Sequence, residues 1–359
     1  MATNRPRELD APVYVRNAWY VACWDYELHS RDLLSRTLIN QPVLLYRRED
    51  GAPVAMADQC CHRLAPLSRG RREGDDIRCM YHGLKFNDEG QCIDIPGQSD
   101  IPAQFRVHRF PVVIAHSWVW VWMGDPELAD EALIPTSMSL SNDAFALRPG
   151  FLDYRANYQL INDNLTDFSH LAYTHEHTFA RGRDDLARET PTIEALERGV
   201  RISRWVEATV GGGNYGSGAA SAGLVDTWMS YDYLVPGILL MHSKVFPAGT
   251  AQRCNLGVPD GEPLHASFTA QAVTPMTDDT TRYFYSWGPR TSEHQANPQL
   301  VLDMLALAKA AFEEDRLMIE AQQRSIKLNP DAPINTIVHD RAPLMMRRII
   351  EHLAARDIS

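Results

Sequence analysis

The chain has 359 residues, enough for two domains that each bury a core of their own. Hydrophobic residues make up 45% of it and charged residues 23%, as in ordinary soluble proteins, and the formal net charge is −11. An acidic protein gains nothing from a phosphate backbone, so this charge argues against nucleic acid as a partner.

The N-terminus and the cysteines indicate where the protein works. Residues 1–12 are polar and contain no apolar core of a signal peptide, and the most apolar stretch, Phe110–Gly124, is too short to span a bilayer. Six cysteines in a chain of this length suggest metal ligation or free buried thiols rather than disulfides. We therefore expect a cytoplasmic protein that is not bound to a membrane.

Residues 13–124 have the pattern of a small all-β domain. The apolar run Thr37–Tyr46 precedes the charged segment Arg47–Gly51, which predicts one strand followed by a hairpin turn. Asn87–Gly90 predicts a second hairpin turn. Val107–Met123, with its alternating tryptophans, predicts one or two further buried strands.

The pattern changes after residues 125–150, a stretch rich in proline and small polar residues that we interpret as a linker. Tyr158–Leu171 is predicted to be a helix. Asn297 and Pro298 are predicted to begin a long helix that ends near Lys327. Between the two helices lie runs typical of strands: Val200–Val206, Thr227–Leu234, Ile238–Val245, Ser267–Val273 and Thr281–Trp287. A sheet with its helices on one side predicts an α+β domain over residues 150–359.

The first group of candidate metal ligands lies in two short segments. Cys60-Cys61-His62 is separated by 16 residues from Cys79-Met80-Tyr81-His82, which gives the spacing C-x-H-x16-C-x2-H. Each segment offers one thiolate and one imidazole, and this set suits a 2Fe–2S cluster with two cysteines on one iron and two histidines on the other. A structural zinc site is the alternative, but such sites usually pair cysteine with cysteine and histidine with histidine. Cys61, between the two ligands of its segment, is interpreted as a non-ligand.

The second group begins with two histidines within residues 162–177. His170 and His175 are five residues apart, which on an ideal helix would place them about 140° apart around the axis. If both bind one metal ion, the helix must end or bulge between them. His177 is a competing ligand. Ferrous oxygenases combine two such histidines with one carboxylate and leave the other metal positions open to oxygen and substrate.

The carboxylate is expected on the long C-terminal helix, where Glu313, Glu314 and Asp315 follow one another. At helical spacing, Asp315 lies in the middle of an apolar stripe formed by Met304, Ala308, Ala311, Phe312, Met318 and Ile319. Glu313 falls on the opposite face and Glu314 to one side. Because a buried carboxylate is costly unless it binds a cation, the sequence predicts Asp315 as the third ligand.

A glycine-rich segment matches a dinucleotide-binding pattern by its letters alone. Gly211-Gly-Gly213-Asn-Tyr-Gly216 fits G-x-G-x-x-G, but that motif requires a helix to follow, and the next residues are poor helix formers. We interpret the segment as a loop. The chain should therefore lack its own NAD(P)H site.

Both groups of ligands resemble the motifs of one enzyme family. Cys-Cys-His-Arg-Leu-Ala-Pro-Leu-Ser and Cys-Met-Tyr-His-Gly-Leu-Lys-Phe resemble the two ligand loops of Rieske oxygenase α subunits, and Gly83-Leu84 resembles the vanillate O-demethylase branch. Asn164-x-x-Asp167-x-x-His170-x4-His175 resembles the mononuclear-iron motif of the same family. The resemblance extends over nearly the whole chain.

The resemblance implies a fold and two cofactors. It implies an N-terminal all-β Rieske domain at residues 13–124 and a catalytic domain of the helix-grip (START-like) antiparallel-sheet type at residues 150–359. One 2Fe–2S Rieske cluster and one mononuclear ferrous ion would be present. Their ligands would be Cys60, His62, Cys79 and His82 for the cluster, and His170, His175 and Asp315 for the mononuclear iron.

The resemblance also implies a route for electrons. The family assembles as head-to-tail trimers, so we expect a homotrimer in which Asp167 bridges His170 and the His82 of a neighbouring subunit. Asn164 and Asp167 are thus the expected catalytic residues next to the iron. A separate NAD(P)H-dependent flavin and iron–sulfur reductase would supply electrons. With O2, the enzyme would hydroxylate or oxidatively O-demethylate a substituted aromatic acid.

Two alternatives remain open. The first is an aromatic ring-hydroxylating dioxygenase, and the second is a Rieske-type electron-transfer protein whose C-terminal domain only binds a small molecule. The substrate contacts are not assigned by any pattern. Trp228, Tyr233, His242 and His265 lie in the expected pocket domain and could hold an aromatic carboxylate, although ordinary packing explains each of them equally well.

Overall fold

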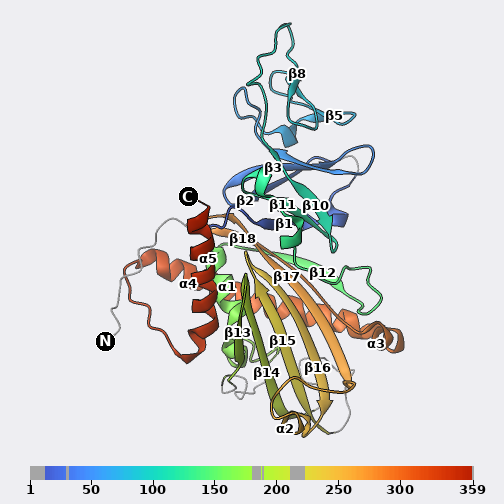
Figure 1. Cartoon of the computed structure of the whole chain (residues 1–359), viewed down its shortest axis with the longest axis vertical. Coiled ribbons are helices and arrows are strands. Elements are labelled where there is room, and N and C mark those ends of the chain that lie inside the picture. The colour runs from blue at the N-terminus through green and yellow to red at the C-terminus, as the bar shows by residue number, and fades with distance from the viewer. Residues whose placement is uncertain (1–12, 30–31, 180–186, 188–189, 211–222, 358–359) are drawn as a thin grey trace. The chain divides into compact units, whose positions relative to one another are not determined.

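The computed structural model describes residues 13–29, 32–179, 187, 190–210 and 223–357 (Figure 1). The glycine-rich segment from Gly211 to Gly216 lies outside these residues. The chain forms two compact units. The N-terminal unit contains Tyr14–Ile134 together with Thr274–Asp278, and the C-terminal unit contains Pro135–Val273 and Asp279–Arg356. The domain limits expected from the sequence, 13–124 and 150–359, stay a prediction.

The described part of the N-terminal unit consists of three small antiparallel sheets with strand orders β1-β11-β10, β2-β3-β4-β9 and β5-β6-β7-β8. The strands are β1 (Trp19–Trp24), β2 (Leu34–Leu38), β3 (Gln41–Arg47), β4 (Pro53–Ala57), β5 (Arg71–Glu73), β6 (Asp76–Arg78), β7 (Lys85–Phe86), β8 (Cys92–Asp94), β9 (Arg109–Phe110), β10 (Val112–Ala115) and β11 (Trp118–Trp122). Both predicted hairpins are present, because β3 pairs with β4 and β7 pairs with β8. The N-terminal region is therefore all-β, as predicted.

One predicted strand of this unit is wrong. Thr37–Tyr46 is not a single strand, because the chain turns between β2 and β3 at Ile39 and Asn40, whose φ angles are 41° and 66°. The Ile39 side chain is buried, so its apolar character hides the turn from a reading of hydrophobic periodicity. By contrast, the alternating tryptophans of β11 are all buried and confirm the strand that they predict.

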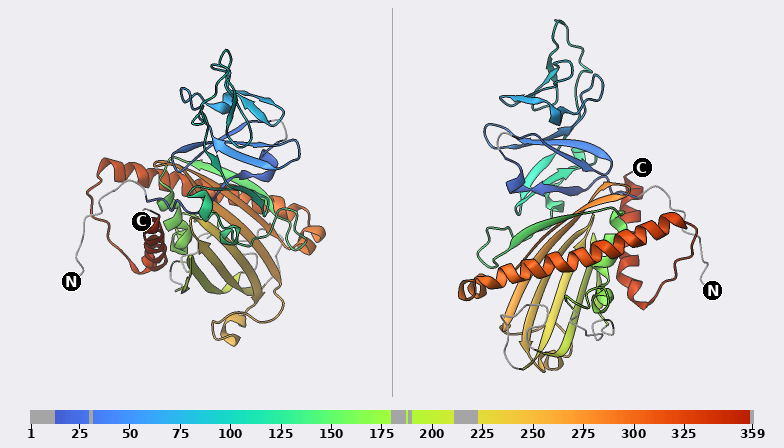
Figure 2. Two further views of the ribbon diagram at one scale, coloured as in Figure 1. Left: turned by 45° about the horizontal axis from the view of Figure 1, so that its top comes forward. Right: turned by 180° about the vertical axis from the view of Figure 1, so that it is seen from behind.

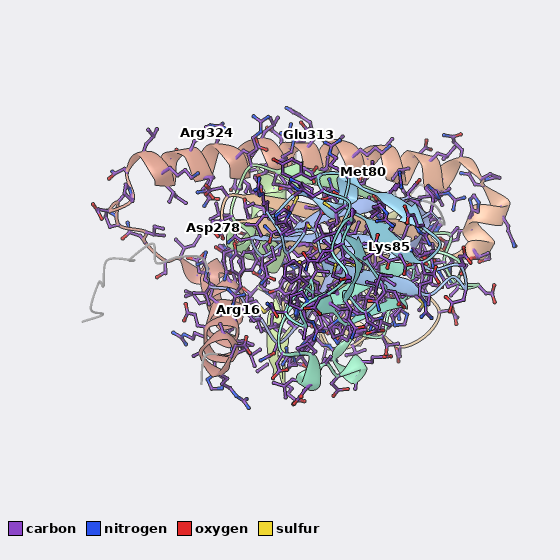
Figure 3. The ribbon with its side chains drawn as sticks, turned by 90° about the horizontal axis from the view of Figure 1, so that it is seen from above. Arg16, Met80, Lys85, Asp278, Glu313 and Arg324 are labelled. Atoms are coloured by element: carbon purple, nitrogen blue, oxygen red, sulfur yellow. The ribbon has the colours of Figure 1, made fainter. Side chains whose placement is uncertain are left out.

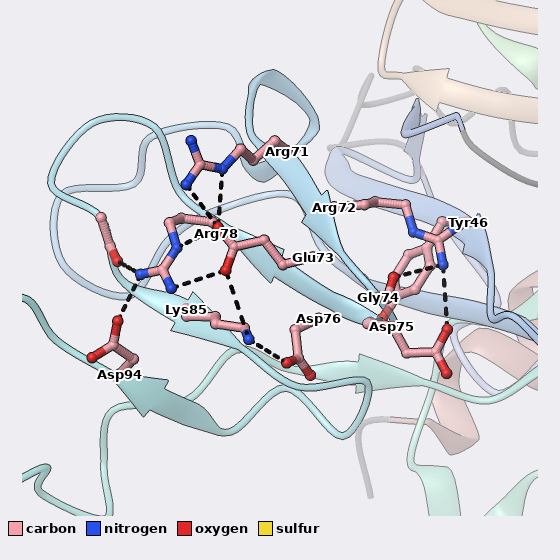
Figure 4. Close-up of polar contacts among 11 residues, drawn as sticks. Tyr46, Arg71, Arg72, Glu73, Gly74, Asp75, Asp76, Arg78, Lys85 and Asp94 are labelled. Atoms are coloured by element: carbon pink, nitrogen blue, oxygen red, sulfur yellow. Dashed lines mark hydrogen bonds and ion pairs between the residues drawn. The ribbon is translucent and has the colours of Figure 1, made fainter.

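Ion pairs hold the sheet β5-β6-β7-β8 next to the second cysteine–histidine segment (Figure 4). The Glu73 carboxylate accepts hydrogen bonds from Arg71 and Arg78 and lies 3.7 Å from the Lys85 ammonium group. Hydrogen bonds from these arginines lower the pKa of Glu73 to about 2. Arg78 also donates to the carbonyl oxygen of Gly83 at 2.7 Å, so the network fixes the loop that follows Cys79.

The described part of the C-terminal unit is a seven-stranded antiparallel sheet with helices against one face, which confirms the predicted α+β class. The strand order is β12-β18-β17-β16-β15-β14-β13. The strands are β12 (Arg148–Tyr154), β13 (Thr192–Leu196), β14 (Gly199–Val210), β15 (Leu224–Leu234), β16 (Ile238–Pro247), β17 (His265–Thr277) and β18 (Thr280–Pro289). The helices are α1 (Tyr158–Thr166), α2 (Thr250–Arg253), α3 (Thr291–Ala296), α4 (Gln299–Leu328) and α5 (Arg341–Arg356). Figure 2 shows α4 running across one face of the sheet.

Helix α4 begins and ends close to where the sequence predicts. The Asn297 side chain accepts a hydrogen bond from the backbone N–H of Gln299 at 3.2 Å, which satisfies one of the free donors of the first turn. The apolar stripe faces the sheet, with Met304, Ala308, Ala311, Phe312 and Ile319 buried, whereas Met318, expected in the same stripe, is exposed. Figure 3 shows Glu313 and Arg324 on this helix, and Glu313 pairs with Arg316. No helix among the described residues combines the length and the apolar character needed to cross a membrane.

Candidate metal centres and substrate cavity

The segment between α1 and the second histidine is shaped by Asp167. Helix α1 ends at Thr166, and a short 3-10 helix follows from Phe168 to Ala172. The Asp167 carboxylate accepts hydrogen bonds from the backbone N–H of Ser169 at 2.8 Å and from its hydroxyl at 2.9 Å. Such a local side-chain bond competes with helix continuation. The predicted single helix to Leu171 is therefore wrong beyond Thr166, but the helical stretch does end between His170 and His175.

This break brings three side chains from two distant segments together. The ligand atoms of His170, His175 and Asp315 all lie within 4.8 Å of one another. The Asp315 Oδ1 atom is 3.2 Å from His175 Nε2 and 3.6 Å from His170 Nε2. His175 and Asp315 are buried, with exposed fractions of 1% and 4%, whereas His177 is exposed and lies outside this group.

The second nitrogen of each histidine is bound by a group outside the trio. His170 Nδ1 donates to the carbonyl oxygen of Asp167 at 2.5 Å, and His175 Nδ1 donates to Glu314 Oε2 at 2.8 Å. Thr178 also donates to Glu314 Oε2, at 2.6 Å. These bonds occupy the Nδ1 atoms, so both rings turn their Nε2 atoms toward Asp315, where the Nε2 atoms could act as metal ligands.

Glu314 is the functional residue that sequence reasoning missed. The helical wheel places it to one side of the apolar stripe and Glu313 on the opposite face, but only the fold shows that the turn carrying His175 lies against the side of Glu314. No signal in the sequence indicates that a carboxylate at that position would bind a histidine.

The electrostatics of the trio fit a bound cation. Burial would lower the pKa of His175, but its hydrogen bonds to Asp315 and Glu314 outweigh burial and raise that pKa above its ordinary value. Burial lowers the pKa of His170, which favours the neutral, metal-binding ring. Two imidazoles and one buried carboxylate form the donor set of mononuclear ferrous sites, and a cation there would compensate the buried charge.

Asn164 and Asp167 border the trio in different ways. The Asn164 side-chain nitrogen donates to Asp315 Oδ1 at 3.0 Å and lies 3.3 Å from His170 Nε2. Asp167 lies on the other side of His170, where a groove opens between α1, α4, α5 and the segment from Asp331 to Thr336. We call this the α1–α5 groove. Asp167 is thus placed beside a candidate ligand and is not itself part of the trio.

The two cysteine–histidine segments have the same backbone hydrogen bonds. In the first, the N–H of Cys60 donates to Ala65 and the N–H of Leu64 donates to Cys60. In the second, the N–H of Cys79 donates to Leu84 and the N–H of Gly83 donates to Cys79. Leu64 and Gly83 both have positive φ, 56° and 80°, so each turn depends on a left-handed residue at the same place.

These two turns present the four candidate cluster ligands. Cys60 and Cys79 are each 2% exposed, and the rings of His62 and His82 are exposed with their centroids 4.6 Å apart. Burial raises the pKa of Cys60 to about 12, and the neighbouring Cys79 adds to the shift. A metal centre would stabilise both thiolates there, so the residues fit a cluster with an inner cysteine side and an outer histidine side.

A cavity adjoins the histidine–aspartate trio and is closed by the sheet. Its polar wall contains Ser243, Thr269 and Gln271, and its apolar wall contains Leu165, Phe168, Leu171, Phe179, Met229, Met241, Trp287 and Phe312. Asn164, His170, His175 and Asp315 complete the lining. A molecule in this cavity would therefore touch the candidate metal site.

The four candidate substrate residues do not line this cavity. The Tyr233 hydroxyl donates to Asn162 at 2.6 Å, and Trp228 packs against Trp205. His242 packs against Phe268, and His265 lies near Glu293. The alternation of side chains along a strand could have identified the lining residues. Met229 and Met241 lie one position away from Trp228 and His242, so they face the opposite side of the sheet, which is the side of the cavity.

Known protein families match both halves of the chain. Residues 18–111 match the Rieske [2Fe-2S] domain, and residues 154–356 match the vanillate O-demethylase oxygenase C-terminal domain. The chain is 38% identical to the iron–sulfur subunit TsaM1 of the toluene-4-sulfonate monooxygenase system of Comamonas testosteroni, over 95% of this chain and 97% of that protein. It is 32% identical to the oxygenase component of dicamba O-demethylase from Stenotrophomonas maltophilia, over 95% of this chain and 98% of that protein.

Solved structures agree with these matches. The crystal structure of dicamba monooxygenase bound to 3,6-dichlorosalicylic acid aligns with a TM-score of 0.85 at 29% identity, over 97% of this chain and all of that one. Another aligned structure, with a TM-score of 0.76 and 27% identity, is dicamba monooxygenase with non-haem iron and dicamba. A two-part match of this extent leaves one conclusion: the chain belongs to the Rieske oxygenases of the vanillate O-demethylase type, which makes it an enzyme with a Rieske 2Fe–2S cluster and a mononuclear non-haem iron.

Proposed function

We propose that this chain is the terminal oxygenase of a multicomponent system and that it hydroxylates or oxidatively O-demethylates a substituted aromatic acid. The main observation that supports the proposal is the cavity next to the histidine–aspartate trio. Its apolar wall of aromatic and methionine side chains suits a benzene ring, and the same cavity is lined by His170, His175 and Asp315. A ring held by that wall would present a substituent to the metal site.

In the proposed mechanism, His170, His175 and Asp315 hold ferrous iron, which supplies O2 activation when electrons arrive. Phe179, Trp287 and Phe312 exclude water from the reacting substituent. Asn164 donates to Asp315 and so keeps the carboxylate in place. Glu314 holds the ring of His175 with its Nε2 atom toward the metal site.

The proposed Rieske domain, residues 13–124, receives the electrons, and the proposed catalytic domain, residues 150–359, uses them. Cys60, His62, Cys79 and His82 would ligate the cluster. The histidine side is the exposed side, so His62 and His82 would be the ligands through which a bound cluster exchanges electrons most directly. A separate NAD(P)H-dependent reductase with flavin and iron–sulfur centres would reduce the cluster.

We further propose a homotrimer in which the cluster of one subunit serves the iron of the next. The tip of the two ligand turns exposes Leu64, Met80 and Tyr81, with exposed fractions of 65%, 56% and 61%. Contiguous exposed apolar side chains of this kind indicate an interaction surface. The α1–α5 groove leads to Asp167 and His170 and exposes Met318 and Ile334. A tip seated in the groove of a neighbouring subunit would bring His82 to Asp167, which would then bridge His82 through its carboxylate and His170 through its backbone carbonyl.

The experiment is a single turnover without any reductase. Dithionite reduces the cluster of the iron-loaded enzyme without oxygen, and excess reductant is removed. A panel of methyl- and methoxy-substituted benzoates and benzenesulfonates is then mixed with the enzyme and O2. We expect cluster oxidation coupled to a hydroxylated product, or to formaldehyde from a methoxy group. An enzyme that reoxidises without forming product from any aromatic acid contradicts the proposed substrate class.

Labelled oxygen and metal analysis separate the two alternatives. A monooxygenase places one atom of labelled O2 in the product, whereas a ring dihydroxylase places both there. An electron-transfer protein would contain the cluster but no mononuclear iron, and its cluster oxidation would yield no product.

A further inference from the structure

The face of the sheet that closes the cavity carries a buried arginine without a carboxylate partner. Arg204, on β14, is 4% exposed, its Nε atom has no hydrogen-bond partner, and no ion pair joins it to an acid in the described part of the chain. A buried charge without an opposite charge is costly, so proteins seldom keep one without a role for it.

Strand register places Arg204 beside the cavity. Arg204 pairs with Met229 on β15, and Met229 pairs with Ser243 on β16, so the three residues form one row across the sheet. Strands β14, β15 and β16 are neighbours in Figure 1. Met229 and Ser243 line the cavity. The guanidinium carbon of Arg204 also lies 5.5 Å from the centre of the Phe168 ring, which lines the cavity too.

The surroundings of Arg204 contain a second buried polar group. Phe168 stacks on Tyr231 with ring centroids 4.7 Å apart, and the buried Tyr231 hydroxyl lies beside the Arg204 guanidinium group. Burial raises the pKa of Tyr231, and the charge of Arg204 and its polar contact with the hydroxyl oppose that shift. The carboxylate that acts on the same hydroxyl is that of Asp167, whose two oxygens already accept hydrogen bonds from Ser169.

We infer that Arg204 determines specificity by supplying the positive charge that selects an ionised acid group on the aromatic substrate, held in the cavity near Ser243 and the Phe168 ring. The inference deepens the proposed function and rests on it for the identity of the cavity as the substrate site. No lysine or arginine is among the described residues that line the cavity, so we place the positive charge just behind the wall, at Arg204. Because charges interact more strongly in a poorly hydrated interior than in water, we expect Arg204 to favour an anion in the cavity by about tenfold.

The test compares an acid with its neutral counterpart. Calorimetric titration of the holoenzyme with 4-methylbenzoate and 4-methylbenzamide gives the dissociation constant of each. We expect wild-type protein to bind the acid about tenfold more tightly than the amide. Arg204→Met should remove that preference by weakening the acid alone, with the amide within about twofold, and Arg204→Lys should restore most of it. Arg201→Met is the matched control, because Arg201 lies on the same strand but pairs with Asp232 in an exposed position.

Thermal stability separates this role from a structural one. Because Arg204→Met removes an uncompensated buried charge, its Tm should equal or exceed that of the wild type. A lower Tm with equal weakening of acid and amide would show that Arg204 is structural and would overturn the inference. Unchanged binding of both ligands together with slower cluster oxidation would also overturn the inference, because it would show that Arg204 acts on Asp167 rather than on the substrate. The Gln271 side-chain oxygen is also buried without a partner, so loss of acid binding in Gln271→Leu but not in Arg204→Met would move the acid group to that end of the cavity.

The outcomes also separate the inference from the proposed function. Selective binding of the acid without any oxidation of it would leave the inference standing and contradict the proposed function. Oxidation of acid and amide with equal KM, in wild type and in Arg204→Met alike, would support the oxygenase function and overturn the role of Arg204.

Discussion

In the N-terminal unit, four candidate ligands come from two turns with the same backbone hydrogen bonds, whereas in the C-terminal unit the candidate iron ligand Asp315 lies 140 residues after His175. The turns need only a few residues each, with a left-handed residue to close them, and their histidines are exposed. The trio needs the break at Asp167 and the packing of α4 on the sheet, and two of its members are buried. A site that exchanges electrons, as in the N-terminal unit, must be accessible to a redox partner, while a site that activates oxygen, as in the C-terminal unit, must exclude water.

The largest effect should follow from removing the buried carboxylate. Asp315→Ala should lose the mononuclear iron and bring turnover to background, because two imidazoles alone do not complete the donor set. The cluster spectrum should remain, since its ligands belong to the other unit. Iron analysis together with the visible spectrum checks both statements. Glu313→Ala is the matched control and should be nearly silent, because Glu313 lies two residues before Asp315 and pairs with Arg316.

The converse effect is expected in the N-terminal unit. Cys79→Ala should abolish the visible spectrum of the cluster, because a buried thiolate ligand is lost, and turnover should stop with it. Cys61→Ser should keep the spectrum, since Cys61 is interpreted as a non-ligand. Retention of mononuclear iron in Cys79→Ala would show that the two centres load independently. A bleached Cys61→Ser protein would overturn the ligand assignment.

A smaller effect should arise at the link between the two centres. Asp167→Asn should keep both metals and normal cluster reduction, yet slow oxidation of the cluster by O2 and substrate by about 10- to 100-fold, because an amide is a poorer acceptor for the N–H group of His82 from the neighbouring subunit. The His170 N–H group keeps its acceptor, because it donates to the backbone carbonyl of Asp167. Rapid mixing of the reduced variant with oxygen and substrate measures that rate. Wild-type reoxidation would exclude a bridge, and loss of iron would show that Asp167 acts on the metal site instead.

The smallest effect should come from the residue that orients His175. Glu314→Gln should weaken iron binding by about tenfold, since the amide is a weaker acceptor for the His175 N–H group. Titration of the apoprotein with ferrous ion measures the affinity. Thr178→Val, which removes another hydrogen bond to Glu314, should weaken it less. Equal affinity in Glu314→Gln and the wild type would limit Glu314 to a surface role.

The sequence by itself determined the features that depend only on residues close together in the chain. The mixed cysteine–histidine spacing, the hairpin turns, the five strand-like runs of the C-terminal unit and the long helix all follow from short-range chemistry. The position of Asp315 on the apolar stripe of that helix is also local, because a helix places its side chains at a fixed angle. Each of these features can be predicted without knowing which part of the chain packs against it.

Only the tertiary structure decided the rest. Glu314 acquires its role because the segment with His175 lies against one side of α4, and the cavity faces Met229 and Met241 rather than Trp228 and His242 because of how the sheet is covered. The turn at Ile39 escapes prediction because a buried apolar side chain looks the same in a strand and in a turn. The sequence likewise cannot show that no described carboxylate pairs with Arg204, because whether a charge finds a partner depends on side chains that the fold brings to it from elsewhere in the chain.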